Sequence, residues 1–230
     1  PGLFSPRTRS LQSTTPIWEA VTLNATHLRS VFLTDPEPQA VAAFYEKVWG
    51  LLKVSDGEAV YLQGVGPEHH IVVLRPGSQT AVVGYSLGLA DRATVDAAAE
   101  KLQRKADTAI VAGPGILDQP GGGYGFSILD PDGRELVVSA EVAAAPDRTD
   151  TEGGPPIRPI KISHLVLNSP NVDNYRELLI DDFGFRIADE TEHMVFFRCN
   201  LDHHSIALVR APHASLNHIA FEVPTADDVL

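Results

Sequence analysis

The fold is decided by two stretches of the sequence, THLRSVFL at residues 26–33 and SHLVLN at residues 163–168. Each is a run typical of a β-strand, followed by a polar turn and a segment whose apolar residues have helical spacing. These segments, 40–50 and 172–184, both end in glycine, as amphipathic helices commonly do. The chain therefore contains an internal repeat in which each copy begins with a strand and a helix.

Three landmarks of the first copy have counterparts in the second. We pair His27 with His164, His70 with His204 and Tyr85 with His218, at offsets of 137, 134 and 133 residues. Because the offset is nearly constant, we expect the two copies to share one strand order and to differ slightly in their loops.

Each copy has the pattern of paired βαβββ modules. The first copy continues with a helix at about 92–105 and two strands, 125–129 and 135–139. The sequence thus predicts an α+β fold of two tandem domains, each a half-open barrel with one concave face. The predicted parts are an N-terminal arm at 1–23, a first domain at 24–142, a linker rich in Pro, Gly and acidic residues at 143–159, and a second domain at 160–230.

Composition excludes several classes of function. The 230 residues are 43% apolar and carry 18 basic against 30 acidic side chains, a formal net charge of −12. Nucleic acids and anionic membranes would repel such a chain. No apolar run approaches the ~20 residues of a membrane-spanning helix. The single cysteine, Cys199, excludes an internal disulfide and is interpreted as a small core residue, so the cytoplasm is the simplest location.

The two ends of the sequence carry expectations of their own. The first 20 residues lack the apolar segment of a signal peptide and are interpreted as a mobile or partner-contacting arm. The last residues, 225–230, look like the beginning of a helix, and the second copy lacks its final strands. We therefore expect a fragment with an incomplete second domain, weak or absent activity and an unpaired sheet edge.

Two histidines of the second copy are candidates for metal binding. In a β-strand alternate residues share a face, so His164 lies beside Val166, and His218 lies on one face with Ala220 and Glu222. On paired strands of a concave sheet, two imidazoles can converge on one ion. The alternative is that both are polar residues at strand starts, in contact with water.

The strand of His164, the run 202–208 and the run 216–223 resemble the C-terminal domain of type I extradiol ring-cleavage dioxygenases. These enzymes belong to the vicinal oxygen chelate superfamily, with glyoxalase I and the bleomycin-resistance proteins. The resemblance implies a non-haem Fe(II), or Mn(II), held by His164, His218 and a glutamate expected beyond Leu230.

The first copy departs from this pattern. It has His27 where the resemblance places His164, but Tyr85 where it places His218, and a neutral phenol is a poor ligand for Fe(II). Glu135 is the first-copy counterpart of the missing glutamate. We therefore expect the first domain to be a metal-free vestige.

By the same resemblance His204 is the acid–base residue beside the metal, because an imidazole can accept and return protons near neutral pH. Val166 and Phe196 are expected to line the substrate pocket, with the aromatic ring stacked on the substrate. The alternatives are a polar hairpin edge for His204, since His69-His70 recurs in the first copy, and plain core for Val166 and Phe196.

The resemblance implies extradiol cleavage of a catecholic ring by O₂, in a protein that is expected to form a homo-oligomer. Two alternatives within the superfamily stay open: a glyoxalase- or isomerase-type metalloenzyme, and a metal-free protein that binds a small aromatic molecule. The residue on the missing last strand would distinguish them, since a glutamate favours an enzyme and an apolar residue favours the binder.

Overall fold

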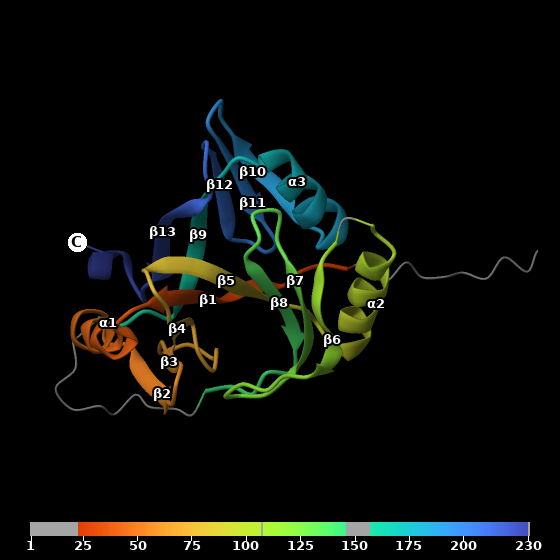
Figure 1. Ribbon diagram of the computed structural model, residues 1–230. Coiled ribbons are helices and arrows are strands. Elements are labelled where there is room, and N and C mark those ends of the chain that lie inside the picture. Colours follow the sequence, from red (N-terminus) through yellow and green to blue (C-terminus); the bar gives the residue numbers. More distant parts are fainter. Residues whose placement is uncertain (1–22, 107, 146–156, 230) are drawn as a thin grey trace, which may run out of the picture.

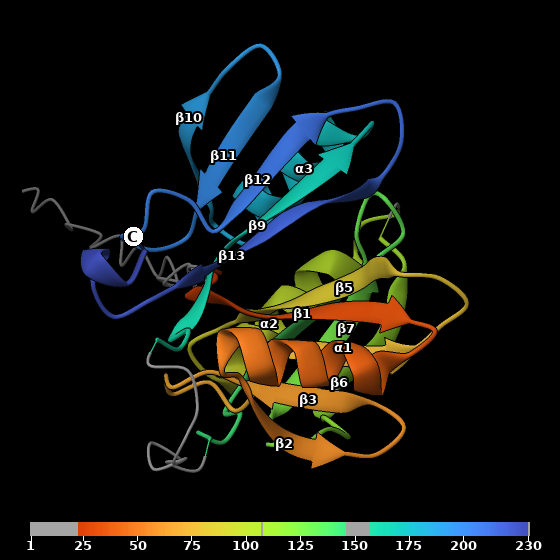
Figure 2. The same ribbon diagram turned by 90° about the vertical axis from the view of Figure 1, so that its left-hand side faces the viewer.

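The structure is a computed structural model that describes residues 23–106, 108–145 and 157–229. The predicted arm therefore lies almost wholly outside the described residues, as does most of the predicted linker. In the described part of the chain, no helix is long and apolar enough to cross a membrane. The chain forms two sheets, which Figures 1 and 2 show packed together, with β9 and β13 against β1 and β5.

The N-terminal sheet contains two complete βαβββ modules. Its eight strands have the order β2-β3-β4-β1-β5-β8-β7-β6, and α2 packs against β6, β7 and β8. The first module is β1 (His27–Asp35), α1 (Pro38–Phe44), β2 (Leu52–Asp56), β3 (Val60–Gln63) and β4 (Val72–Pro76). The second is β5 (Ala81–Gly88), α2 (Arg92–Gln103), β6 (Ile110–Ile116), β7 (Tyr124–Leu129) and β8 (Glu135–Ala140).

The C-terminal sheet contains a third module and the first strand of a fourth. Its order is β10-β11-β12-β9-β13, with β12 parallel and β13 antiparallel to β9. The elements are β9 (Lys161–Ser169), α3 (Val172–Arg176), β10 (Arg186–Glu190), β11 (Met194–Arg198), β12 (Ile206–Arg210), β13 (Ser215–Glu222) and the short 3₁₀ helix η3 (Ala226–Val229). The α+β class and its βαβββ modules are confirmed, whereas the domain boundaries stay a prediction.

Both predicted glycine-ended helices form, and each finishes in a π-helical turn. These turns are η1 (Tyr45–Trp49) after α1 and η2 (Glu177–Asp182) after α3. The chain then reverses at Gly50 and Gly184, whose φ angles of 63° and 68° lie in the region that favours glycine. The apolar spacing predicted the helices, but not their π-helical ends.

The strand register corrects the correspondence between the two copies. Tyr85 lies opposite Val31 in the N-terminal sheet, and Ile219 lies opposite Leu165 in the C-terminal sheet. The same offset of 134 residues relates the first-strand pairings throughout, including the two bulges of that strand pair. The repeat is therefore in strict register along these strands, without the slippage that the sequence offsets suggested.

This register shows that two of the three predicted residue pairs are wrong. His164 corresponds to Ser30, and His218 corresponds to Gly84. His27 corresponds instead to Lys161, while the Tyr85 ring is fully buried in the core. The predicted pairs are displaced by three residues and by one residue. Either displacement moves a side chain to the other face of its strand, so matching residue types misled the alignment. The pairing of His70 with His204 agrees with the register.

Candidate metal centre

The backbone brings His164 and His218 together on two adjacent antiparallel strands. His218 lies opposite Val166, His164 lies opposite Ala220, and a register shift between Leu216 and His218 adjusts the strand at this point. The two Nε2 atoms are 3.2 Å apart, and the rings are nearly perpendicular at 80°. The predicted convergence of these imidazoles is therefore the geometry that the structure has.

The geometry fits two ligands of one ion. Two nitrogens at ~2.1 Å from a metal and at right angles to each other are about 3.0 Å apart. Burial first, and then the neighbouring His204 and His218, lower the pKa of His164 to about 4, so the ring is neutral near pH 7. A neutral imidazole is the form that binds a metal.

The outer nitrogens of both rings have polar partners. His164 Nδ1 lies 3.2 Å from Ser163 Oγ, and His218 Nδ1 lies 2.9 Å from Asn217 Oδ1. Asn217 in turn donates from Nδ2 to Asn168 Oδ1 at 3.1 Å. Such partners orient the rings of metal-binding histidines and set their tautomers.

His204 lies in the loop between β11 and β12, next to the pair. Its ring centroid is 4.2 Å from that of His164 and 5.1 Å from that of Phe196, the latter in an edge-on contact. Its Nδ1 lies 3.0 Å from His203 Nδ1. Burial, His203 and His218 together lower the pKa of His204. The structure thus brings four of the five predicted site residues into ring contact: His164, His218, His204 and Phe196. The fifth, Val166, lies opposite His218 and is buried.

A third metal ligand is not among the described residues. Within 23–106, 108–145 and 157–229, no group of three or more His, Cys, Asp or Glu side chains could hold an ion together. The N-terminal copy indicates where one would come from, because Glu135 on β8 lies opposite Gly84, the counterpart of His218. In a strand paired with β13 in the same way, the residue at the position of Glu135 would lie opposite His218.

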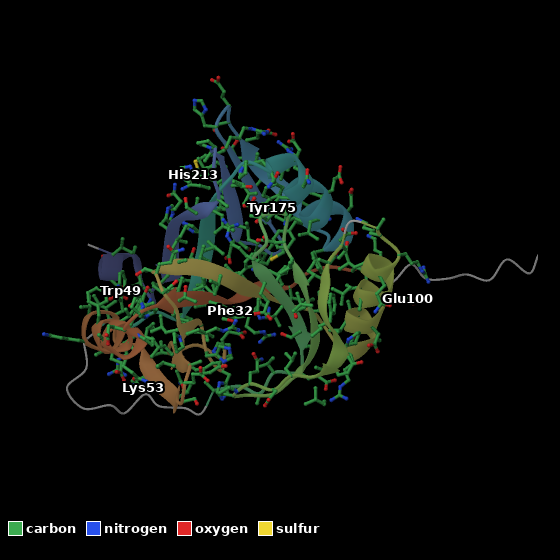
Figure 3. All side chains as sticks on the ribbon, in the orientation of Figure 1. Phe32, Trp49, Lys53, Glu100, Tyr175 and His213 are labelled. Atoms are coloured by element: carbon green, nitrogen blue, oxygen red, sulfur yellow. The ribbon has the colours of Figure 1, made fainter. Side chains whose placement is uncertain are left out.

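The equivalent face of the N-terminal sheet holds other side chains. Ser30 pairs with Ser86 at 2.6 Å, and Glu135 forms an ion pair with Arg75 at 2.9 Å. A Cβ atom at Gly84 would be 2.6 Å from the ring of Phe32, which Figure 3 shows at the centre of this sheet. No imidazole stands at the two positions that correspond to His164 and His218.

Three residues near the site were not predicted from the sequence: Asn217, Lys161 and Asp202. Asn217 directly precedes the predicted ligand His218, and this position in the sequence could have indicated its role. The ion pair between Lys161 and Asp202 joins residues 41 positions apart and needed the strand register to be found. For Cys199, burial raises the pKa of the thiol, and its Sγ lies 3.4 Å from Ser205 Oγ, as suits a packed side chain better than a nucleophile.

The chain is similar to several known proteins. Residues 161–230 match the model of the Glyoxalase/Bleomycin resistance protein/Dioxygenase superfamily. Metapyrocatechase 2 of Cupriavidus necator is 24% identical over 139 residues, which are 51% of this chain and 43% of that protein. The chain thus matches less than half the length of this curated relative.

Solved structures extend the likeness to both sheets. The Mn(II)-bound glyoxalase from Novosphingobium aromaticivorans is 36% identical, with a TM-score of 0.80 over 89% of this chain and 68% of that one. The 2,3-dioxygenase LapB from Pseudomonas sp. KL28 is 18% identical, with a TM-score of 0.75 over 90% of this chain and 78% of that one. At that identity the second likeness shows the fold alone.

Proposed function

Because the chain belongs to the glyoxalase/bleomycin resistance protein/dioxygenase superfamily, we propose that it is an extradiol-type dioxygenase acting on a catecholic ring. The observation that carries this proposal is the cluster of three imidazoles, with His204 stacked beside the converging pair of His164 and His218. The likeness to Metapyrocatechase 2 supports the substrate class, and the Mn(II)-bound glyoxalase supports a metal-dependent site.

His164 and His218 would hold the ion through their Nε2 atoms, with a glutamate opposite His218 as third ligand. Fe(II) is our first choice and Mn(II) the second, because either suits two imidazoles and a carboxylate with open positions. When bound, the ion supplies a template on which the two vicinal oxygens of a catechol and O₂ meet. A homo-oligomer located in the cytoplasm is part of the same proposal.

His204 is assigned to proton transfer. Its Nδ1 faces His203, so Nε2 is the atom that accepts a proton from a substrate hydroxyl and later returns it. The lowered pKa keeps the ring neutral, and therefore able to accept a proton, at neutral pH. Phe196, in edge-on contact with His204, offers its ring to the substrate ring. Val166, buried opposite His218, is assigned to the lining of the same pocket.

The test, made on protein in which the third ligand is in place, separates metal ligand from acid–base residue. We expect His164→Ala and His218→Ala to lose bound metal, because one imidazole leaves too few ligands. We expect His204→Phe to keep its metal and to lose turnover by about 10²–10⁴-fold, since it removes only the proton carrier. Metal content and O₂ uptake with a series of catechols are measured on the same preparations. Metal loss in His204→Phe would assign His204 to the metal ligands. Unchanged turnover would mean that His204 is only a polar residue of the loop.

One observation favours a second function. The 36% identical solved structure is a Mn(II)-bound glyoxalase, so an isomerase-type reaction at the same two histidines is the alternative. An isomerisation consumes no O₂. If protein with its third ligand and its metal in place takes up no O₂ with any catechol, the dioxygenase proposal is contradicted. Binding of an aromatic ligand that survives a chelator would favour the metal-free binder.

A further inference from the structure

We propose that Lys161 and Asp202 are positioning residues that hold the loop of His204 against the two strands carrying His164 and His218. With Glu222 they form what we call the lysine clamp. This inference deepens the proposed function and rests on it, because it concerns how the acid–base residue is presented to the metal face.

One ammonium group joins three segments. Lys161 Nζ lies 2.7 Å from Asp202 Oδ2 and 3.1 Å from Glu222 Oε2. Lys161 begins β9, Glu222 ends β13, and Asp202 lies in the loop between β11 and β12. Each of these segments carries one of the three imidazoles, so the clamp fixes their relative positions from one end of the sheet.

The clamp is half-buried and stays charged. Burial lowers the pKa of Lys161, but the hydrogen bonds that its ammonium group donates to Asp202 and Glu222 outweigh burial and raise that pKa above its usual value. Because these side chains are only about one-third exposed, solvent screens the attraction between them less than it would in a fully exposed ion pair. The ion pairs therefore persist over the whole range in which a histidine could serve as acid or base.

The rest of the loop shows why a tie is needed. Its two ends are anchored by the backbone, where Ser205 N donates to Phe197 O at 2.8 Å and Leu165 N donates to Ser205 O at 3.0 Å. Its middle bulges into solvent, and Leu201 is fully exposed. Asp202, two residues before His204, ties this middle back to β9.

The N-terminal copy provides independent support. At the offset of 134 residues Lys161 corresponds to His27 and Asp202 to Glu68, and these two side chains are also paired, at 3.0 Å. Arg29, also on β1, supplies the cation, with its guanidinium 2.5 Å from Glu68. Both copies thus place a cation of the first strand on an acid two residues before a loop histidine.

The histidines that follow are presented alike. His70 meets the ring of Tyr61 edge-on at 4.9 Å and 79°, and His204 meets Phe196 at 5.1 Å and 78°. The N-terminal copy has Ser30 and Gly84 in place of the metal-binding pair, yet it keeps the cation–acid tie. Because the tie persists where those imidazoles do not, it belongs to the presentation of the loop histidine and not to the ligand set.

The experiment compares Lys161→Met, Lys161→Arg and Asp202→Asn in the holoenzyme. The control is Arg104→Met, which removes an exposed ion pair with Glu100 on α2. We expect Lys161→Met and Asp202→Asn to keep their metal, because the pairing of β9 with β13 is intact. In these two variants, hydrogen exchange of the segment 199–205 should be faster, and kcat should fall by about 10- to 100-fold with a smaller change in KM. Lys161→Arg should restore most of the protection from exchange and most of kcat.

The outcomes separate the clamp from the proposed function. Unchanged exchange of 199–205 in both Lys161→Met and Asp202→Asn overturns the clamp, as does loss of metal in both. Asp202→Asn is nearly isosteric, so it tests the clamp even if Lys161→Met fails to fold. If the protein cleaves no catechol at all, the proposed function fails, while metal content and hydrogen exchange still decide whether the clamp holds the loop.

Discussion

Two imidazole nitrogens 3.2 Å apart share either a proton or a metal ion, and the hydrogen bonds around them show which atoms are available. Asn217 donates from Nδ2 to Asn168 Oδ1, so its own Oδ1 faces His218 and accepts from Nδ1–H. With Nδ1 as the donor, the lone pair of His218 that can bind an ion lies at Nε2, toward His164. Ser163 can either donate to or accept from His164 Nδ1, which lets His164 also present a lone pair when an ion binds.

This arrangement predicts an effect of Asn217 on metal affinity. Replacing it by leucine removes the acceptor that fixes the tautomer of His218, so we expect metal to bind about 10- to 100-fold more weakly. Asn217→Asp retains an acceptor for Nδ1–H and should lose much less. Titration of the apoprotein with Mn(II) measures both variants. Equal affinities of Asn217→Leu and the unchanged protein would show that the amide has no role in tuning the ligand.

His70 predicts a dependence of stability on pH. It is buried, and burial, His69 and Arg29 lower its pKa from 6.5 to about 3. Above pH 6.5 neither state binds the proton, so His70 has no effect there. Below pH 6.5 the unfolded chain binds a proton that the folded chain refuses, and the free energy of unfolding falls by about 1.4 kcal/mol per pH unit until about pH 3.

The measurement is urea unfolding of the metal-free protein between pH 7 and pH 4. His70→Gln, which does not titrate, should have a shallower slope over this interval than the unchanged protein, although it is less stable at pH 7. His193→Gln is the matched control, because that side chain is exposed. Parallel slopes for His70→Gln and the unchanged protein would contradict the buried, neutral state of His70.

At the scale of elements, equivalent helices have unequal surroundings. Phe44 at the end of α1 corresponds to Leu178 in η2, yet the first is 53% exposed and the second 9%. The difference arises because η2 packs against α2 of the N-terminal sheet, while Trp49 in η1 meets only Phe221 of β13 among the aromatic rings described. The same helical position is therefore buried in one copy and exposed to solvent in the other.

These two positions form a matched pair for mutation. Leu178→Ala should lower the free energy of unfolding by about 2–5 kcal/mol, because it removes buried methyl groups and leaves a cavity. Phe44→Ala, at an exposed position where alanine favours the helix, should change it by no more than about 0.5 kcal/mol. Urea unfolding at neutral pH measures both. Similar losses would mean that the face of α1 and η1 is covered in solution.

Sequence analysis predicted the elements better than their register. Apolar periodicity and terminal glycines sufficed for the helices ending at Gly50 and Gly184. The imidazole cluster was predictable because alternation in a strand fixes which face His164 occupies. The match of His27 with His164 failed because the two copies keep the same backbone pairing with different side chains, and only the strand partners show it.

At the scale of the whole molecule, a buried polar network joins the two sheets. The turn between β7 and β8 inserts Asp130 and Asp132 beside α3, where Figure 3 shows Tyr175. Tyr175 Oη donates to Asp130 at 2.5 Å, and Arg134 forms an ion pair with Asp132 at 2.9 Å. Around them one hydrophobic core includes residues of both sheets. Burial raises the pKa of Asp130 because it disfavours the charged carboxylate, whereas the hydrogen bonds to Asp130 stabilise that charged form.

Since the core is shared, we expect the two sheets to unfold in one cooperative transition, and the network to set its midpoint. Tyr175→Phe should lower the free energy of unfolding by about 1–3 kcal/mol, because Asp130 then lacks a buried donor. Arg134→Met should cost more, about 3–5 kcal/mol, because two buried carboxylates lose their cation. Arg92→Met, which breaks an exposed pair with Glu141, is the control and should cost less than about 1 kcal/mol. Hydrogen exchange of peptides from each sheet during urea unfolding measures the transition. Separate midpoints for the two sheets in the unchanged protein would show that the turn network does not couple them.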